Sequence, residues 1–159
     1  LVLGAKIDIA GPQGRRQIPL SDLYIEDGKA HLTLADSELI VAVHLPANQP
    51  PSTYEKIRIR SAIDFPLAGV AVALAVSGSI ISSLRIALTG TNSRPFLLAG
   101  TDAFVGRHID EKLLQEIERL VQKQVQPMRT TLTSANYRRV TASALARRLT
   151  LNLGRSLAT

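Results

Sequence analysis

The stretch VAVALAVSGSIISSLRIAL, residues 70–88, decides the fold of this chain. Branched apolar residues fill every second position up to Val76, and mostly apolar side chains alternate again from Ile80 to Leu88. A period of two places such residues on one face of a strand, and Ser77-Gly78-Ser79 between the runs supplies a turn. Residues 65–84 lack charge over a length that would span a bilayer, but this alternation predicts a tightly packed β-hairpin instead.

The segment directly before the hairpin, YEKIRIR at residues 54–60, is predicted to be a third antiparallel strand. Its cations Lys56, Arg58 and Arg60 occur at every second position, so they would share one face with Tyr54. That face suits an anion. A nucleic-acid backbone, a cofactor phosphate, an electron-rich ring and a row of internal carboxylates are all candidates.

The remaining segments predict an α+β fold. Strands are expected at 1–10, 15–20 and 37–45, followed by a proline-rich linker at 47–52 that is the candidate domain boundary. Three helices are expected after the hairpin: a short one at 94–104, one capped by Asp110 that ends before Pro127, and one capped by Ser134. The second part of the chain is therefore a three-stranded antiparallel sheet packed with a three-helix bundle. The first three strands would form a small open sheet with too little apolar area to fold alone.

Three- and four-residue spacings in the last two helices predict which side chains face the core. The inward set is Leu113, Leu114, Ile117, Leu120, Val121 and Val125 in the first of the two, and Ala135, Val140, Ala144, Leu145 and Leu149 in the second; Arg138, Arg139, Arg147 and Arg148 are expected to face outward.

Composition excludes several kinds of site. The chain has 159 residues and no cysteine, which rules out disulfides, thiolate catalysis and cysteine-ligated metal centres within it. Its three histidines are scattered without a ligand pattern, so no metal site is expected. The net charge of +6 comes from the C-terminal part, since residues 1–92 hold 8 basic and 8 acidic groups and residues 93–159 hold 11 and 5. The start of the chain has no pattern of an export leader.

Four segments in a fixed order carry a family resemblance: SELIVAVHLP (37–46), YEKIRIRSAIDFPLAGVAVAL (54–74), LRIALTG (84–90) and SANYRRVTASALARRL (134–149). The chain resembles the flavin-binding medium subunit of the molybdenum hydroxylase (xanthine dehydrogenase) family. Residues 1–50 align with the end of the FAD-binding domain, whose N-terminal part is absent here. Residues 53–159 align with the C-terminal domain of the CO dehydrogenase flavoprotein type. Where many members have a glycine pair after the LRIAL-type strand, this chain has Thr89-Gly90-Thr91.

Within the family, the sequence of these segments is most similar to the β subunit of 4-hydroxybenzoyl-CoA reductase. The medium subunits of carbon monoxide, aldehyde or xanthine-type dehydrogenases are the alternatives. The resemblance implies a cytoplasmic oxidoreductase subunit that carries FAD and passes electrons between an external carrier, such as ferredoxin, and 2Fe-2S clusters of a partner subunit. Molybdopterin and the substrate chemistry would belong to a third subunit of a heterotrimer, itself dimerised. A 4Fe-4S cluster of the reductase type would have to lie in the absent N-terminal part, and no catalytic residue is expected in this chain.

The resemblance also implies two FAD contacts. Ile40 corresponds to an apolar residue packed against the flavin region, and Lys56 to a lysine near the isoalloxazine ring, where a cation favours the negative charge of a reduced flavin. The glycine-rich loops that hold the FAD diphosphate would lie upstream of residue 1. Arg60 and Asp64 are expected to form a local ion pair, and Arg58 to be solvated or to face another subunit.

One competing hypothesis comes from the charge asymmetry alone. A stand-alone basic α+β module could bind nucleic acid through the arginine-rich last helix. Aromatic residues make up only 4% of the chain, however, and no stacking motif accompanies the arginines. A solvated helix face or a protein contact is the favoured interpretation of that charge.

Overall fold

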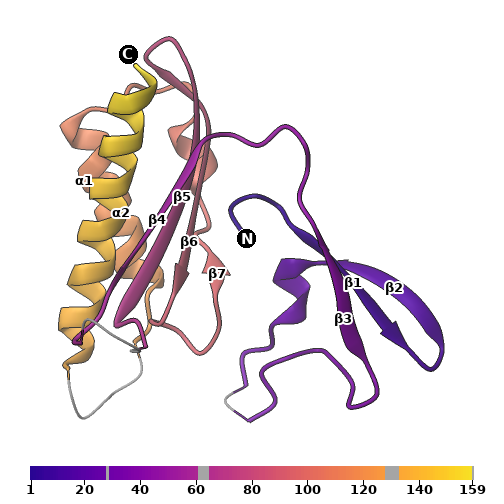
Figure 1. Cartoon of the computed structure of the whole chain (residues 1–159). Coiled ribbons are helices and arrows are strands. Elements are labelled where there is room, and N and C mark those ends of the chain that lie inside the picture. The colour runs from indigo at the N-terminus through magenta and orange to yellow at the C-terminus, as the bar shows by residue number, and fades with distance from the viewer. Residues whose placement is uncertain (28, 61–64, 128–132, 159) are drawn as a thin grey trace. The chain divides into compact units, whose positions relative to one another are not determined.

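The computed structural model describes residues 1–27, 29–60, 65–127 and 133–158 (Figure 1). The chain divides into two compact units. Unit 1 comprises Leu1 and Leu3–Gln49, and unit 2 comprises Val2 and Pro50–Thr159. The division falls inside the proline-rich segment 47–52, which has the composition of a linker.

Unit 1 is a three-stranded antiparallel sheet in the order β2-β1-β3. Its strands are β1 (Lys6–Gly11), β2 (Gly14–Pro19) and β3 (Leu39–His44), and a 3-10 helix, η1 (Leu20–Leu23), follows β2. β3 lies within its predicted segment 37–45, whereas β1 ends one residue beyond the predicted 1–10 and β2 begins one residue before the predicted 15–20. The buried core consists of Ile7, Ile9 and Leu23 with a few partly buried neighbours, so it is small.

The edge strand β3 exposes an unusual amount of apolar surface. Leu39 and Val43 are 71% and 61% exposed, Val41 is also exposed, and Leu45 directly after the strand is 58% exposed. Contiguous exposed apolar side chains on an edge strand normally mark a surface that another element covers. The apolar side chains of β3 are therefore open to contact with another element.

Unit 2 contains a four-stranded antiparallel sheet in the order β4-β5-β6-β7. Its strands are β4 (Ser52–Ile57), β5 (Ala68–Ser77), β6 (Ile80–Thr89) and β7 (Phe96–Leu97). The hairpin β5–β6 closes through Gly78 and Ser79, and Gly78 adopts a positive φ of 61°, which a glycine tolerates without steric cost. The predicted hairpin is confirmed, and the short strand β7 adds a fourth strand to the three expected.

A β-bulge in the hairpin changes which isoleucine is buried. The register shifts between Ala75 and Val76, so that Val76 pairs with Ile81. A bulge moves one residue out of the alternation. Ile81 is consequently 1% exposed and Ile80 is 40% exposed, which makes the prediction that Ile80 shares the face of Leu84 wrong.

Two α-helices, α1 (Glu111–Gln124) and α2 (Ala135–Leu157), cover one face of this sheet (Figure 1). The expected caps are present, because Asp110 Oδ1 accepts from Leu113 N at 2.7 Å and Ser134 Oγ accepts from Tyr137 N at 3.1 Å. The α+β fold class is confirmed. The third predicted helix is wrong: segment 94–104 forms β7 and a 3-10 helix, η2 (Thr101–Phe104).

Local chemistry explains why the segment 94–104 does not form an α-helix. Pro95 disfavours a helical conformation at Arg94 and cannot donate a helical hydrogen bond. Gly100 then adopts a left-handed conformation with φ 85° directly before η2. The backbone between them turns to the sheet, where Leu98 N donates to Ile86 O at 2.8 Å.

The core of unit 2 lies between the sheet and the helices. Val70, Val72 and Leu74 of β5 are fully buried there. The apolar stripe of α1 is confirmed, with five of the six predicted residues buried and Leu120 partly buried. In α2 the prediction holds for Leu145 and Leu149 but fails for others, since Val140 is 48% exposed and Ala144 is also exposed.

Candidate functional site

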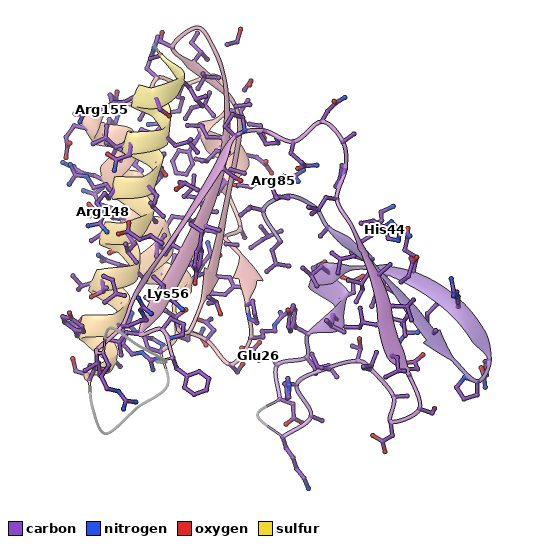
Figure 2. All side chains as sticks on the ribbon, viewed as in Figure 1. Glu26, His44, Lys56, Arg85, Arg148 and Arg155 are labelled. Carbon is purple, nitrogen blue, oxygen red and sulfur yellow. The ribbon has the colours of Figure 1, made fainter. Side chains whose placement is uncertain are left out.

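The predicted flavin-adjacent residue Lys56 lies on the face of the sheet opposite the helices. Strand register fixes this, because Lys56 pairs with Gly69, whereas Ile57 pairs with Ala68, which belongs to the helix-side core. Lys56 is exposed and makes no ion pair or hydrogen bond with any residue that the structure describes. Figure 2 shows it near the end of β4. Its ammonium group is therefore available to a ligand.

The surface beside Lys56 is built from very small side chains. On this face β5 presents Gly69, Ala71 and Ala73, directly opposite Lys56, Tyr54 and Ser52 of β4. On the other side, β6 places Thr89, Ala87 and Arg85 in the same three rows. Gly69, Ala73 and Ala87 are buried, and the cations Lys56 and Arg85 stand at two diagonal corners of these three rows.

Tyr54 packs across this surface and explains why position 69 is a glycine. A Cβ atom at Gly69 would lie 2.9 Å from Tyr54 Oη, 3.4 Å from Tyr54 Cε2 and 2.8 Å from Thr89 Cγ2. These distances are shorter than ordinary carbon contacts, so a side chain at position 69 would overlap the ring, and the packing of Tyr54 requires a glycine there. The phenol thus lies over β5 next to Lys56. Tyr54 is 54% exposed and Lys56 is exposed, so an aromatic ring and an ammonium group are accessible on this face.

The second predicted contact, Ile40, lies in unit 1 on β3. It pairs with Ile9 of β1 at a point where the register between the two strands shifts. Ile9 is fully buried, whereas Ile40 is 41% exposed. Ile40 can therefore offer an apolar contact to a ligand. Ile40 and Lys56 belong to different units, and each stands on its own sheet.

Two charge clusters stabilise the sheet around Ile40. Arg16 donates to both carboxylate oxygens of Glu38 at 2.9 Å, and Ala35 N donates to Glu38 at 3.0 Å. These contacts, the Arg16 bond above all, lower the pKa of Glu38 to about 2. On β1, the Asp8 carboxylate accepts from Gln17 at 2.8 Å and contacts His44 at 2.7 Å. These two hydrogen bonds lower the pKa of Asp8.

The alternation of cations ends with the strand. Because β4 stops at Ile57, Arg58 and Arg60 follow it outside the ladder and do not continue the face of Lys56. Arg58 is exposed. The predicted ion pair between Arg60 and Asp64 lies outside the described residues, since Asp64 belongs to the segment 61–64.

One of the four arginines of the last helix that the sequence predicts to face outward is buried. Arg138 is only 7% exposed and donates to Leu67 O at 3.0 Å and to Gly90 O at 2.6 Å. It therefore ties the ends of β5 and β6 to the start of α2. The helical spacing indicates that position 138 is buried, because it continues the buried stripe of 142, 145 and 149. The positive charge of the side chain led to the prediction of an exposed position instead.

The other three arginines that the sequence predicts to face outward also have partners. Arg147 donates to Glu111 at 2.7 Å and lies 3.9 Å from Glu118, both on α1. Arg148 contacts Glu55 of β4 at 2.6 Å, and Arg139 donates to Val125 O at 3.4 Å. The helix consequently uses its cations to join neighbouring elements of unit 2, which contradicts a free row of phosphate-tracking arginines.

Two other kinds of site find no support in the described part of the chain. Those residues contain no group of three histidine, cysteine, aspartate or glutamate side chains arranged to hold a metal ion. No described helix has the length and apolarity needed to cross a bilayer.

A four-stranded antiparallel sheet with two helices on one face defines an α+β module. Residues 52–153 match the family model of the CO dehydrogenase flavoprotein C-terminal domain, and the chain belongs to that family.

Individual relatives agree with this assignment. The chain is 26% identical over 144 residues to the glyceraldehyde dehydrogenase medium chain of Sulfolobus acidocaldarius, covering 90% of this chain and 50% of the relative. It is 30% identical over 152 residues to the carbon monoxide dehydrogenase medium chain of Afipia carboxidovorans, covering 92% and 51%. Among solved structures, reconstituted CO dehydrogenase from Oligotropha carboxidovorans superposes with a TM-score of 0.88 at 27% identity, covering 97% of this chain and 54% of that one. The chain thus spans about half the length of the curated relatives it matches.

Proposed function

We propose that this chain is part of the FAD-carrying electron-transfer subunit of a molybdenum-containing oxidoreductase. The observation that carries the proposal is the match of residues 52–153 to the CO dehydrogenase flavoprotein C-terminal domain. The exposed Lys56, which has no partner among the residues that the structure describes, supports it from the structure.

The relatives favour one branch of the family. Two of them are medium chains of glyceraldehyde dehydrogenase and carbon monoxide dehydrogenase. The proposal therefore takes a dehydrogenase of the carbon monoxide, aldehyde or xanthine type in preference to 4-hydroxybenzoyl-CoA reductase, for which these relatives give no support. Substrate chemistry belongs to another subunit in either case.

The residues of this chain have limited, definable roles in such a subunit. FAD, when bound, would supply the capacity to accept and release electrons. Lys56 would place a positive charge near the ring and so favour its reduced, more negative state. Ile40 would provide an apolar contact that keeps water from the cofactor. Unit 1 is proposed to be the end of the FAD-binding domain, and the loops that bind the diphosphate are placed upstream of residue 1.

The exposed apolar residues of β3 support this placement of unit 1. An edge strand with Leu39, Val41 and Val43 exposed needs a covering element, and the relatives contain about twice as much chain. The full proposal includes a 2Fe-2S subunit, a molybdopterin subunit, an external carrier such as ferredoxin, a dimerised heterotrimer and a cytoplasmic location.

The experiment that tests the proposal uses the full-length protein produced together with the products of its neighbouring genes. The purified complex should release stoichiometric FAD when denatured, and its flavin absorbance should bleach when the enzyme is reduced. Iron, acid-labile sulfide and molybdenum should be found in the other subunits. A full-length protein that purifies without flavin would contradict the proposal.

A further inference from the structure

A surface pocket lies at the end of unit 2 where β5 turns into β6. Its cavity has a volume of about 190 Å³, and its walls come from the hairpin turn, the segment before α1 and the end of α2. Figure 1 shows the C-terminal end of α2 beside this turn. Lys56 pairs with Gly69 near the start of β5, whereas the turn follows Ser77 at its end, more than about 20 Å away at the rise of a strand. The pocket is therefore separate from the end of the sheet that carries Lys56.

Backbone pairing holds the wall that contains His108 against the hairpin. Ile81 N donates to Arg107 O at 2.9 Å, and Gly106 N donates to Ile81 O at 2.8 Å. His108 itself forms an antiparallel bridge with Ile80. The segment before α1 is thus fixed to the start of β6, so this wall is formed without a ligand.

Close packing between α2 and Ile109 shapes the floor of the pocket. A Cβ atom at Gly154 would lie 2.5 Å from Ile109 Cδ1 and 3.8 Å from Leu74 Cδ2. Glycine weakens the interior of a helix, and here its missing side chain lets the isoleucine approach the helix backbone. Val76, Ile109, Leu151 and Gly154 are all partly buried and line the pocket. Together they form an apolar floor.

The polar groups of the pocket belong to its exposed rim. Ser79, His108 and Arg155 are exposed and line the cavity. The side chains of His108 and Arg155 make no hydrogen bond or ion pair with the residues that the structure describes. Arg147 and Arg148 of the same helix, by contrast, are paired with carboxylates. No described aspartate or glutamate lines the pocket. The rim therefore offers a guanidinium group and an imidazole to a ligand.

The size and charge of the pocket define the ligand that it fits. Apolar cavities of about 150 Å³ can bind a benzene ring. A guanidinium group presents a planar fork that matches a carboxylate, and a histidine ring and a serine hydroxyl add hydrogen-bond donors. The C-terminal end of a helix carries partial negative charge, which disfavours an anion. An anion at the end of α2 would consequently depend on Arg155, which lies in the last turn of that helix (Figure 2).

We infer that this pocket binds a small aromatic carboxylate. The ring would rest on the apolar floor, and the carboxylate would accept hydrogen bonds from Arg155 and His108. A cavity of this volume holds one ring, which favours a small molecule over a segment of a protein chain. The inference goes beyond the proposed function and does not depend on it, since none of the lining residues belongs to the face that carries Lys56.

The test is a ligand-observed NMR titration of the full-length, FAD-loaded subunit with benzoate. Benzoate should bind with a dissociation constant of about 1 mM or below. Benzyl alcohol has the ring without the charge and acetate has the charge without the ring, so both should bind at least about tenfold more weakly.

Two variants locate the binding site. Arg155→Gln removes the cation and should weaken benzoate binding by about tenfold or more. Ala158→Phe adds a ring at the wall of the pocket, where Ala158 is exposed, and should also weaken binding. Arg119→Gln is the matched control, because this exposed arginine of α1 does not line the pocket and its loss should leave binding unchanged. Melting temperatures should be alike in all three variants, since the altered side chains are exposed.

Several outcomes would overturn the inference. Absence of benzoate binding to the wild type would do so, as would binding that Arg155→Gln and Ala158→Phe both leave unchanged. Equally tight binding of benzyl alcohol would show that the pocket does not select an anion. Binding that is lost in Lys56→Gln instead would place the benzoate on the proposed flavin face. A full-length protein without flavin would contradict the proposed function alone, and the titration would then have the same expected result.

Discussion

Gly69 shows how one residue organises the face of the sheet that carries Lys56. Its missing side chain admits the ring of Tyr54, which crosses β5 toward Thr89. The position is not a turn, so the reason for glycine is the close approach of a neighbouring side chain. Loss of this packing would displace the aromatic ring next to Lys56.

The Gly69→Ala variant should therefore be destabilised. We expect a loss of about 1–2 kcal/mol in the free energy of unfolding, because the added methyl group overlaps Tyr54 and Thr89. Urea denaturation measures it. In a Tyr54→Ala, Thr89→Ser background, which removes both obstructing groups, the same substitution should be nearly neutral. An equal loss in both backgrounds would contradict the packing explanation.

Glu38 makes the stability of unit 1 dependent on pH. Its pKa in the folded chain is about 2, compared with an ordinary value of 4.5, because the contacts with Arg16 and Ala35 favour the charged form. The stabilisation is therefore fully present above pH 4.5 and is lost as the pH falls toward 2. Hydrogen exchange of the β1 and β2 amides between pH 5 and 2 should show declining protection in the wild type. Glu38→Gln should show a weaker dependence, and identical profiles would contradict this role.

At the scale of elements, sequence patterns predicted what depends on local chemistry. The hairpin follows from alternation around a glycine turn, and both helix caps follow from Asp110 and Ser134. The bulge that buries Ile81 in place of Ile80 depends on pairing between strands, which one strand's pattern does not contain. The helix expected at 94–104 failed because Pro95 and Gly100 outweighed the apolar residues between them.

The same limit applies to the candidate site. The alternation in YEKIRIR placed Lys56 on the correct kind of surface, opposite the isoleucine that faces the core. It did not reveal that the strand ends at Ile57, nor that Tyr54 lies across Gly69, because both depend on β5. The prediction that Arg138 faces outward is wrong. Hydropathy alone assigns a guanidinium group to water, whereas this one donates hydrogen bonds to two backbone carbonyls.

Arg138 should contribute strongly to stability because it links two strand ends to α2. Replacing it with alanine leaves the carbonyls of the buried Leu67 and the partly buried Gly90 without this donor, and we expect a loss of about 2–4 kcal/mol. Arg139→Ala serves as the control, since that residue makes one long hydrogen bond and should lose under about 1 kcal/mol. Chemical denaturation compares the two. Equal losses would show that Arg138 has no special role as a link.

At the scale of the whole molecule, we propose that the chain is about half of a cofactor-binding subunit. The side chains proposed to flank the ring are present, whereas the diphosphate of a dinucleotide is usually held by backbone amides of loops and helix ends. We place those donors upstream of residue 1. A subunit divided in this way should lose most of its affinity for FAD.

The isolated 159-residue chain should accordingly purify colourless. Titration with FAD, followed by fluorescence quenching, should show weak binding or none, whereas the full-length protein should retain the cofactor through gel filtration. The full-length protein with its flavin extracted and restored is the control for the assay. A stoichiometric yellow complex of the isolated chain would show that the diphosphate site has been misplaced.

The measurement that tests the central claim most directly is a redox titration of the full-length, FAD-loaded subunit with Lys56→Ala. Removing the ammonium group should destabilise the reduced flavin by about 1–3 kcal/mol, which lowers the two-electron midpoint potential by about 20–60 mV. Lys56→Arg should retain most of the wild-type value, and Arg155→Ala should match the wild type. The melting temperature of Lys56→Ala should change little, because the exposed lysine has no partner among the described residues. An unchanged midpoint potential in Lys56→Ala, with FAD fully bound, would contradict the claim that this face of the sheet stands beside the flavin.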